Sequence, residues 1–411
     1  MINFRLLKLS DPWLWGSVSL LIIISFFAIF SCTFSMQAKI GADAFLFIKR
    51  QLFSFFIGLI GLSIFAYVDY KRLKRLSLYF YGAMLFFLFV ILFGGAGTVA
   101  QRWLQIGSFS FQPSELSKIV IVICLAAYLS TREKLKSVQE YGVLLAMVGI
   151  PFLLIFRQPD LGTALVFIFI LIGMLAVSGS SPKLLVLMVT PMVSILLRPF
   201  IFLWILYLLG IIVALFLTRA TVWDWVLVLG INVLVGLALP LIWGMLKTYQ
   251  KTRILAFLNP SLDPHGAGYH SLQSRIAIGS GGIFGKGFLH GTQTQLQFIP
   301  EQHSDFIFAA IGEEFGFIGA SFVLALYSVV VWRAMAIASA ASDLFGKLLA
   351  SGIAAMTSFH VFANVGMTLG ILPVVGMPLP FLSFGGSSLM MNMIGVAILQ
   401  SISMRQRKLI F

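Results

Sequence analysis

The residues that could do chemistry in this chain lie in short polar segments at the edges of long apolar runs. Two segments carry an acid with a partner three residues away: Glu115 with Lys118, and Asp160 with Thr163. Residues three apart share a helix face, so each pair can interact. Because an ionisable group at the edge of a bilayer is costly, such pairs usually face a polar cavity. The same region supplies four more candidates for binding a polar substrate: Arg102, Trp103, Gln112 and Ser114.

A simpler interpretation of these acids stays open. Pro113 and Pro159 stand where helices would start, because proline has no N–H to satisfy there and its φ is already helical. Glu115 and Asp160 could then be ordinary first-turn acids, favoured by the helix dipole. That interpretation alone does not explain Lys118, a cation near a positive helix end. We therefore favour a functional polar site.

The longest polar segment spans residues 247–305, about 59 residues rich in glycine and basic side chains. Segments of this length usually carry function. Asp263 is the only acid between residues 247 and 300, and a carboxylate among cations stays ionised. It could accept a proton from a bound hydroxyl as a general base. An Asp-Pro turn residue would explain it equally well.

Further along, the same segment offers groups that suit phosphate oxygens: Gln273, Ser274 and Lys286, with glycines around the lysine. Glu301, His303 and Asp305 then alternate, so an extended stretch would place all three on one face, where a divalent metal could be held. Asp305 could equally be the N-cap of the next helix. His303 could be a hydrogen-bonded structural histidine.

Glu313 and Glu314 lie about two turns into the apolar run that follows. A carboxylate at that depth needs a partner or water, so we interpret Glu314 as support for a cavity or for the structure.

The composition defines the elements that must position these residues. Hydrophobic residues make up 60% of the 411 residues and charged residues only 10%, which excludes a soluble globular protein. Twelve apolar runs are expected to form helices, and most of them are long enough to cross a hydrocarbon core of about 30 Å. The runs are 13–35, 51–68, 76–94, 116–130, 141–156, 161–178, 183–197, 199–217, 222–246, 306–332, 346–372 and 383–403. The sequence predicts an all-α polytopic integral membrane protein, organised as a single domain over residues 1–411.

Basic clusters in short connections set the expected orientation. They comprise Arg5 and Lys8; Lys71, Arg72, Lys74 and Arg75; Arg132, Lys134 and Lys136; and Arg405, Arg407 and Lys408. An even number of spans separates each cluster from the next, so all of them, and both termini, are expected to be cytoplasmic. This parity requires two spans in 183–217, turning at Arg198-Pro199.

The 247–305 segment then lies outside, where its cations would gather an anionic ligand. Long loops are partly exempt from the positive-inside rule, and that alternative also stays open. The first run is expected to be a retained span rather than a cleaved signal peptide. Cys32 and Cys124 both fall inside predicted spans, so no disulfide framework is expected.

Several long motifs resemble one protein family. The strings are RWLQIGSFSFQPSELSK, QPDLGTAL, DPHGAGYHSLQSRIAIGSGGIFGKGFLHGTQTQLQFIPEQHSDFIFAAIGEEFG and LPVVGMPLPFLSFGGSS. They look like those of the shape, elongation, division and sporulation family of peptidoglycan polymerases. The HGTQTQLQFIPEQHSDFIF and GMPLPFLSFGG forms look more like the elongation members than the division members. Family members usually have ten spans, and this chain departs from that pattern with three apolar runs where one is usual.

The resemblance implies a glycosyltransferase that polymerises lipid II at the outer face of the bacterial cytoplasmic membrane. It makes Asp263 essential and points to the Glu115 and Lys118 pair in a central cavity and to Trp103. It also implies a divalent cation, Mg²⁺ or Mn²⁺, and a class B penicillin-binding protein as partner, similar to the elongation transpeptidase. The expected substrates are lipid II and a glycan linked to polyprenyl pyrophosphate, with membrane lipids as surroundings. No nucleic-acid partner is expected.

In the expected mechanism Asp263 deprotonates or orients the acceptor hydroxyl, while Arg102, Lys118 and Lys286 neutralise the pyrophosphate leaving group. Two alternatives stay open. A lipid II flippase would also need a polar cavity, but transporters commonly show internal repeats, and we find none. A non-catalytic scaffold for wall synthases would not require Asp263.

Overall fold

The computed structural model describes residues 9–94, 103–106, 109–132, 138–158, 160–180, 182–218, 221–246, 248–259 and 266–406. Arg102 and Asp263, two of the predicted site residues, lie outside these ranges. The described chain is almost entirely helical, and its single small sheet is a hairpin of β1 (Leu104–Ile106) and β2 (Phe109–Phe111), paired antiparallel.

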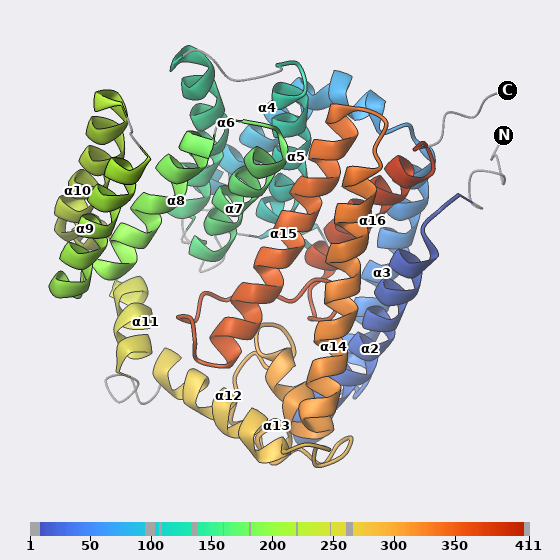
Figure 1. The fold of residues 1–411 in the computed structure, drawn as a ribbon. Helices are drawn as coiled ribbons and strands as arrows, with labels where there is room; N and C mark the ends of the chain where they lie inside the picture. Colours follow the sequence, from blue (N-terminus) through green and yellow to red (C-terminus); the bar gives the residue numbers. More distant parts are fainter. Residues whose placement is uncertain are drawn as a thin grey trace, which may run out of the picture. The chain divides into compact units, whose positions relative to one another are not determined.

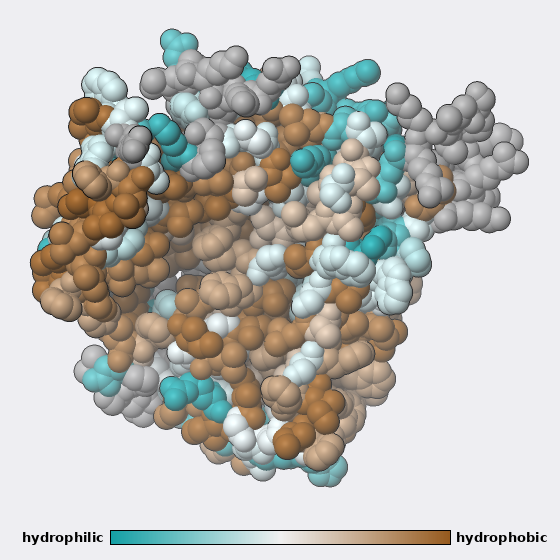
Figure 2. All heavy atoms as spheres, in the orientation of Figure 1, coloured by the Kyte–Doolittle hydropathy of each residue, from teal (hydrophilic) through white to brown (hydrophobic). Residues whose placement is uncertain are grey.

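Each of the twelve predicted spans corresponds to one helix, which confirms the all-α polytopic class (Figure 1). The helices are α2 (Pro12–Lys39), α3 (Leu46–Tyr67), α4 (Lys71–Gly94), α5 (Pro113–Leu129), α6 (Val138–Arg157), α7 (Leu161–Val177), α8 (Pro182–Leu197), α9 (Ile201–Leu217), α10 (Val222–Met245), α14 (Ile307–Ser339), α15 (Leu344–Thr368) and α16 (Gly386–Ser403). Of the described helices, eight are long and apolar enough to cross a membrane, and three more are shorter and apolar. On the face shown in Figure 2, hydrophobic side chains cover much of the helices' surface, which suits a lipid environment.

The 247–305 segment is not an open loop throughout. It contains α11 (Thr248–Leu258), α12 (Ala267–Gly281) and the short α13 (Thr292–Gln295). Helix α12 packs against α14 and α15. In the sequence, Asp263 therefore lies between two helices, α11 and α12.

The chain divides into two compact units, residues 1–174 with 253–411, and residues 175–252. The smaller unit contains α8, α9 and α10, and the predicted turn at Arg198-Pro199 is confirmed, because α8 ends at Leu197 and α9 begins at Ile201. A chain of polar contacts joins its three helices. Asn232 donates its amide to the Thr190 hydroxyl at 2.9 Å, the Ser194 hydroxyl donates to the Asn232 carbonyl at 3.1 Å, and the Trp204 indole donates to Ser194 at 2.6 Å.

In the larger unit, the first helix begins where the last helix ends. The Asp11 amide donates to Gln400 Oε1 at 2.8 Å, and Gln400 Nε2 donates back to the Asp11 carbonyl at 3.0 Å. Arg405, just beyond α16, donates to the Tyr67 carbonyl at 2.6 Å, where α3 ends. The predicted basic cluster at the start of α4 follows directly. The starts of α3, α5, α7 and α16 therefore belong to the opposite end of this helix bundle.

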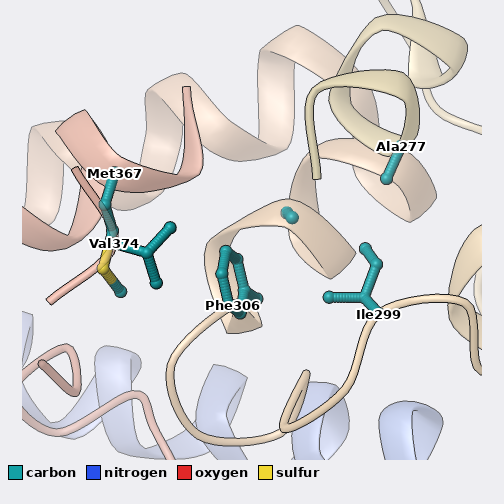
Figure 3. Close-up of a cluster of buried hydrophobic side chains, with 6 residues drawn as sticks. Ala277, Ile299, Phe306, Met367 and Val374 are labelled. Atoms are coloured by element: carbon teal, nitrogen blue, oxygen red, sulfur yellow. The ribbon is translucent and has the colours of Figure 1, made fainter. Parts of the chain in front are cut away.

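A buried hydrophobic cluster fixes α12 at that opposite end (Figure 3). Ala277 of α12 packs with Ile299 and Phe306, which precede α14, and with Met367 and Val374 at the end of α15 and in the connection after it. All five side chains are at least nine-tenths buried. The cluster ties the helix that follows Asp263 to two connections, the segments around residues 301–305 and 375–378.

Candidate active site

A cavity of about 780 Å³ lies where the starts of α3, α5, α7 and α16 meet those two connections. Its volume is in the range of ligand-binding cavities. Nine predicted site residues line it: Trp103, Gln112, Glu115, Lys118, Asp160, Thr163, Glu301, His303 and Asp305. Residues predicted from four separate sequence segments are thus brought to one place.

The predicted pair on α5 forms inside this cavity. Lys118 Nζ donates to Glu115 Oε1 at 2.8 Å, and both side chains are almost completely buried. The second carboxylate oxygen, Glu115 Oε2, has no hydrogen-bond partner among the described residues. A buried acceptor without a donor is costly, so a ligand hydroxyl or amide would be stabilised beside it.

Lys118 has a second partner that the sequence did not indicate. Its Nζ lies 2.9 Å from Nε2 of His360, a buried residue of α15 that also lines the cavity. Four residues further along α15, Asn364 donates to the carbonyl of Asp305 at 2.8 Å and to that of Met377 at 2.6 Å. One face of α15 therefore holds both the lysine and the two connections that close the cavity.

Asp160 is committed to local structure. Its Oδ1 accepts from the Thr163 amide at 3.1 Å, and its Oδ2 accepts from the Thr163 hydroxyl at 3.0 Å and from Gln112 Nε2 at 3.1 Å. Ser114 lies 3.4 Å from the same oxygen and is itself buried. The simpler interpretation thus holds for Asp160 as a cap of α7, and its bonds also fix α7 against the start of α5 beside the cavity.

Two cations at the start of α3 line the cavity and were missed. Lys49 donates to Asp43, and this hydrogen bond, with one from the Phe45 amide, lowers the pKa of the Asp43 carboxyl. The Arg50 guanidinium makes no hydrogen bond or ion pair with any residue the structure describes. The sequence did indicate these two cations, because the predicted topology places both residues outside, against the positive-inside rule.

Glu301, His303 and Asp305 line the cavity but do not form a metal site. The Glu301 side chain is 71% exposed, and the His303 ring packs edge-on against Phe47 at 4.8 Å between ring centroids. Among the described residues no group of three His, Cys, Asp or Glu side chains is placed to hold a metal ion. The three side chains, named only as candidates for a metal site, are thus not grouped around one position in the described structure, and Asp305 is not the N-cap of α14, since Phe306 holds that position.

The His303 ring packs against Phe47 and Phe384, and the alternative of a hydrogen-bonded structural histidine stays a prediction. The His303 carbonyl accepts from the Phe384 amide at 2.9 Å, which joins the 301–305 segment to the start of α16. Burial lowers the pKa of the imidazole, and the Glu301 carboxylate, 3.8 Å from Nε2, opposes that shift.

Lys286 does not line the cavity. Its Nζ donates to Glu313 Oε1 at 2.8 Å and to the Thr292 hydroxyl at 2.7 Å. The backbone N–H groups expected to suit phosphate are also occupied, because those of Lys286 and Gly287 donate to the carbonyls of Glu313 and Glu314 at 3.0 and 2.9 Å. The glycines instead allow two backbone segments to approach closely at a kink in α14. Gly316 has φ 64°, and an added Cβ would lie 2.4 Å from the Gly285 nitrogen.

The remaining predicted residues described by the structure are Ser274, Gln273 and Glu314. Ser274 is fully buried and donates to the Thr368 carbonyl at 2.8 Å, which joins α12 to α15. Gln273 is also on α12 and does not line the cavity. Glu314 accepts a hydrogen bond from Ser31 of α2, which agrees with structural support.

This fold and site define a class of protein. It is a polytopic helical membrane protein with a polar cavity at one end of its helices, and a buried acid–base pair lines that cavity. Residues 12–207 and 182–408 match the cell cycle protein family that comprises FtsW, RodA and SpoVE, and the chain belongs to that family. The two matched stretches overlap at residues 182–207, within the smaller unit.

Individual proteins are similar over most of the chain. The peptidoglycan glycosyltransferase MrdB of Escherichia coli K12 is 36% identical over 363 residues, 88% of this chain and 86% of that protein. The peptidoglycan glycosyltransferase RodA of Treponema pallidum is 37% identical over 369 residues, 82% of this chain and 85% of that protein. These similarities support the RodA type over the division type.

A solved structure supports the same fold. A chain from a study of how a peptidoglycan synthase complex coordinates polymerization and crosslinking superposes with a TM-score of 0.70 and 27% identity. The alignment covers 97% of this chain and 99% of that chain.

Proposed function

We propose that this protein is a peptidoglycan glycosyltransferase of the RodA type, which polymerises lipid II at the outer face of the bacterial cytoplasmic membrane during cell elongation. The observation that carries the proposal is the cavity, which the buried Glu115 and Lys118 pair lines, with one carboxylate oxygen of Glu115 lacking a partner among the described residues. Both relatives named above carry that activity in their names.

The reaction joins two lipid-linked sugars. A hydroxyl of the acceptor attacks the anomeric carbon of the donor glycan, a new C–O bond forms, and the bond from that carbon to the pyrophosphate oxygen breaks. The proton of the hydroxyl passes to a base, and the bonding electrons leave with polyprenyl pyrophosphate. Attack opposite the leaving group inverts the anomeric centre.

Asp263 is the proposed base. It belongs to the segment between α11 and α12, and α12 is anchored by the cluster of Figure 3 to the connections that line the cavity. A carboxylate held within reach of the acceptor hydroxyl would contribute about 10²–10⁴ in rate.

Cations would stabilise the leaving pyrophosphate, so a general acid is not needed. Lys118 lines the cavity as expected, and Arg50 joins it there with a guanidinium that has no partner among the described residues. Arg102 stays a predicted third cation. Lys286 is withdrawn from this role, because its charge is paired with Glu313 outside the cavity.

The orientation follows from the two ends of the larger unit. If the basic cluster at the start of α4 is cytoplasmic, as the positive-inside rule asks, the cavity opens outward and both termini are cytoplasmic. The lipid tails of the substrates would remain in the bilayer beside the apolar helix surfaces while the polar headgroups enter the cavity.

A divalent cation stays a prediction from the resemblance alone. The described residues offer no three-ligand site, so no step is assigned to a metal. A class B penicillin-binding protein is the proposed partner, which is consistent with a structural relative that comes from a peptidoglycan synthase complex.

The test supplies purified protein with labelled lipid II and Mn²⁺, with and without a class B penicillin-binding protein. Wild type is compared with Asp263→Asn. We expect polymer from the wild type and none from the variant, because an amide cannot accept the proton. An active Asp263→Asn variant would remove Asp263 as the base.

The same experiment in liposomes separates the alternatives. If no polymer forms even with the partner, while labelled lipid II crosses the bilayer, the protein is a flippase. If neither occurs and the partner still binds, it is a scaffold.

A further inference from the structure

We infer that His360 is a positioning residue: its Nε2 accepts a hydrogen bond from Lys118 and fixes the lysine ammonium at the place where the substrate anion binds. The inference rests on the proposed function. It is carried by the 2.9 Å contact between Lys118 Nζ and His360 Nε2, made 242 residues apart in sequence inside the cavity.

The neighbours of His360 determine which ring nitrogen carries the proton. Nδ1 lies 2.8 Å from the carbonyl oxygen of Met356, which can only accept, so Nδ1 must be protonated. Nε2 faces an ammonium group, which can only donate, so Nε2 must be unprotonated. His360 is therefore a neutral imidazole whose free lone pair points at Lys118.

A second acceptor matters because lysine is flexible. Its four-carbon stem has many rotamers, and one contact to Glu115 on the same helix leaves the ammonium free to swing with that carboxylate. His360 belongs to α15, is 1% exposed, and has its ring held by Met356. A contact from a second, rigid helix fixes the position of Nζ in space.

The neutrality of this acceptor also suits an anionic substrate. Glu115 and Lys118 together have no net charge, and a second carboxylate at the position of His360 would make the cluster negative and repel pyrophosphate. The imidazole orients the lysine without adding charge. Two of the three N–H groups of Lys118 are then used, and the third is left for the substrate.

The experiment compares three substitutions that differ in reach. The amide of glutamine can occupy the place of Nε2, that of asparagine reaches only the place of Nδ1, and His360→Phe keeps the ring shape without an acceptor. Initial rates of lipid II polymerisation are measured against lipid II concentration. We expect kcat/KM to fall about 10- to 100-fold for His360→Phe and His360→Asn, and to stay within about threefold for His360→Gln.

A matched control substitutes the exposed His290, whose ring Nδ1 lies 2.8 Å from the Phe288 carbonyl oxygen, as His290→Phe. We expect its kinetics to be unchanged. A merely structural role for His360 would lower the Tm of the variants and would not be rescued by glutamine. If His360→Phe does not fold, the glutamine and asparagine pair decides, and equal activities of these two variants would overturn the inference.

A second readout does not need activity. Reductive methylation of Lys118 is followed by mass spectrometry, with Lys49 as an internal reference. We expect faster modification of Lys118 in the phenylalanine and asparagine variants than in wild type and the glutamine variant. If wild type makes no polymer but this pattern holds, the proposed function fails and the positioning role stands. Unchanged methylation in all variants would overturn the positioning role.

Discussion

Two lysine and glutamate pairs in the larger unit, each with a buried carboxylate, have the same N–O distance and different surroundings. Lys118 lies 2.8 Å from Glu115, and Lys286 lies 2.8 Å from Glu313. Glu313 accepts three hydrogen bonds at Oε1, from Lys286, Thr292 and the Gln293 amide, and two at Oε2, both from Thr294. Glu115 has Lys118 at Oε1 and no partner among the described residues at Oε2.

A buried ion pair therefore does not by itself identify a functional site. The Glu313 carboxylate has used its acceptor capacity to hold the chain around α13 against α14, and nothing remains for a ligand. The Glu115 carboxylate keeps an acceptor without a partner among the described residues, and Glu115 lines a cavity of about 780 Å³. Saturation, rather than charge or burial, separates the structural pair from the one that is available for chemistry.

Removing the two lysines gives the largest expected contrast. Lys118→Met should lower lipid II polymerisation at least about 100-fold, because a charge that stabilises the leaving group is lost. Lys286→Met should keep activity within about threefold, because its charge lies outside the cavity. Rates of polymer formation by matched amounts of folded protein measure both. Equal losses of activity in the two variants would contradict the assignment of one pair to function and the other to structure.

For stability we expect the opposite order: removing the charge of Glu313 should cost more than removing the charge of Glu115. Glu313→Gln places an amide NH₂ against groups that are themselves donors, and we expect a cost of about 3 kcal/mol. Glu115→Gln also removes a counter-charge, that of Lys118, but it can place its NH₂ at the unpartnered oxygen and creates no contact between two donors, so it should cost less than Glu313→Gln. Thermal unfolding in detergent checks both. A Glu115→Gln variant as unstable as Glu313→Gln would show that Oε2 has a structural partner.

Sequence reasoning predicted the helices and the local pairs because both depend on near neighbours. The apolar runs follow from hydropathy and length, and the contacts of Glu115 with Lys118 and of Asp160 with Thr163 follow from a spacing of three residues. Even the turn between α8 and α9 was predictable, since only that turn kept the basic clusters on one side.

The errors concern contacts between distant segments. Lys286 was assigned to phosphate because its partner, Glu313, lies 27 residues away in α14, a contact that no local pattern indicates. His360 was missed because a single histidine in an apolar run has no spacing signal, and its partner Lys118 is on another helix. A polar residue inside a predicted span is nevertheless a reason to look for a cavity.

A third acid–base pair, Glu301 with His303, lies at the cavity edge, and we expect it to have the smallest effect on stability. It tests whether a partly exposed pair contributes less than a buried one. Burial holds the pKa of His303 below its ordinary value of about 6.5, so the folded protein binds fewer protons there than the unfolded chain. Stability is therefore full above about pH 6.5 and is lost as the pH falls from there toward the lowered pKa.

We expect the Tm of the wild type to decrease modestly between about pH 7 and 5.5, and His303→Gln to flatten that decrease, because glutamine does not titrate. The control is Glu301→Gln, which removes the carboxylate that favours the protonated ring. The decrease should be steeper in this variant, since burial then acts unopposed. An identical pH profile in all three proteins would show that Glu301 and His303 do not behave as a pair.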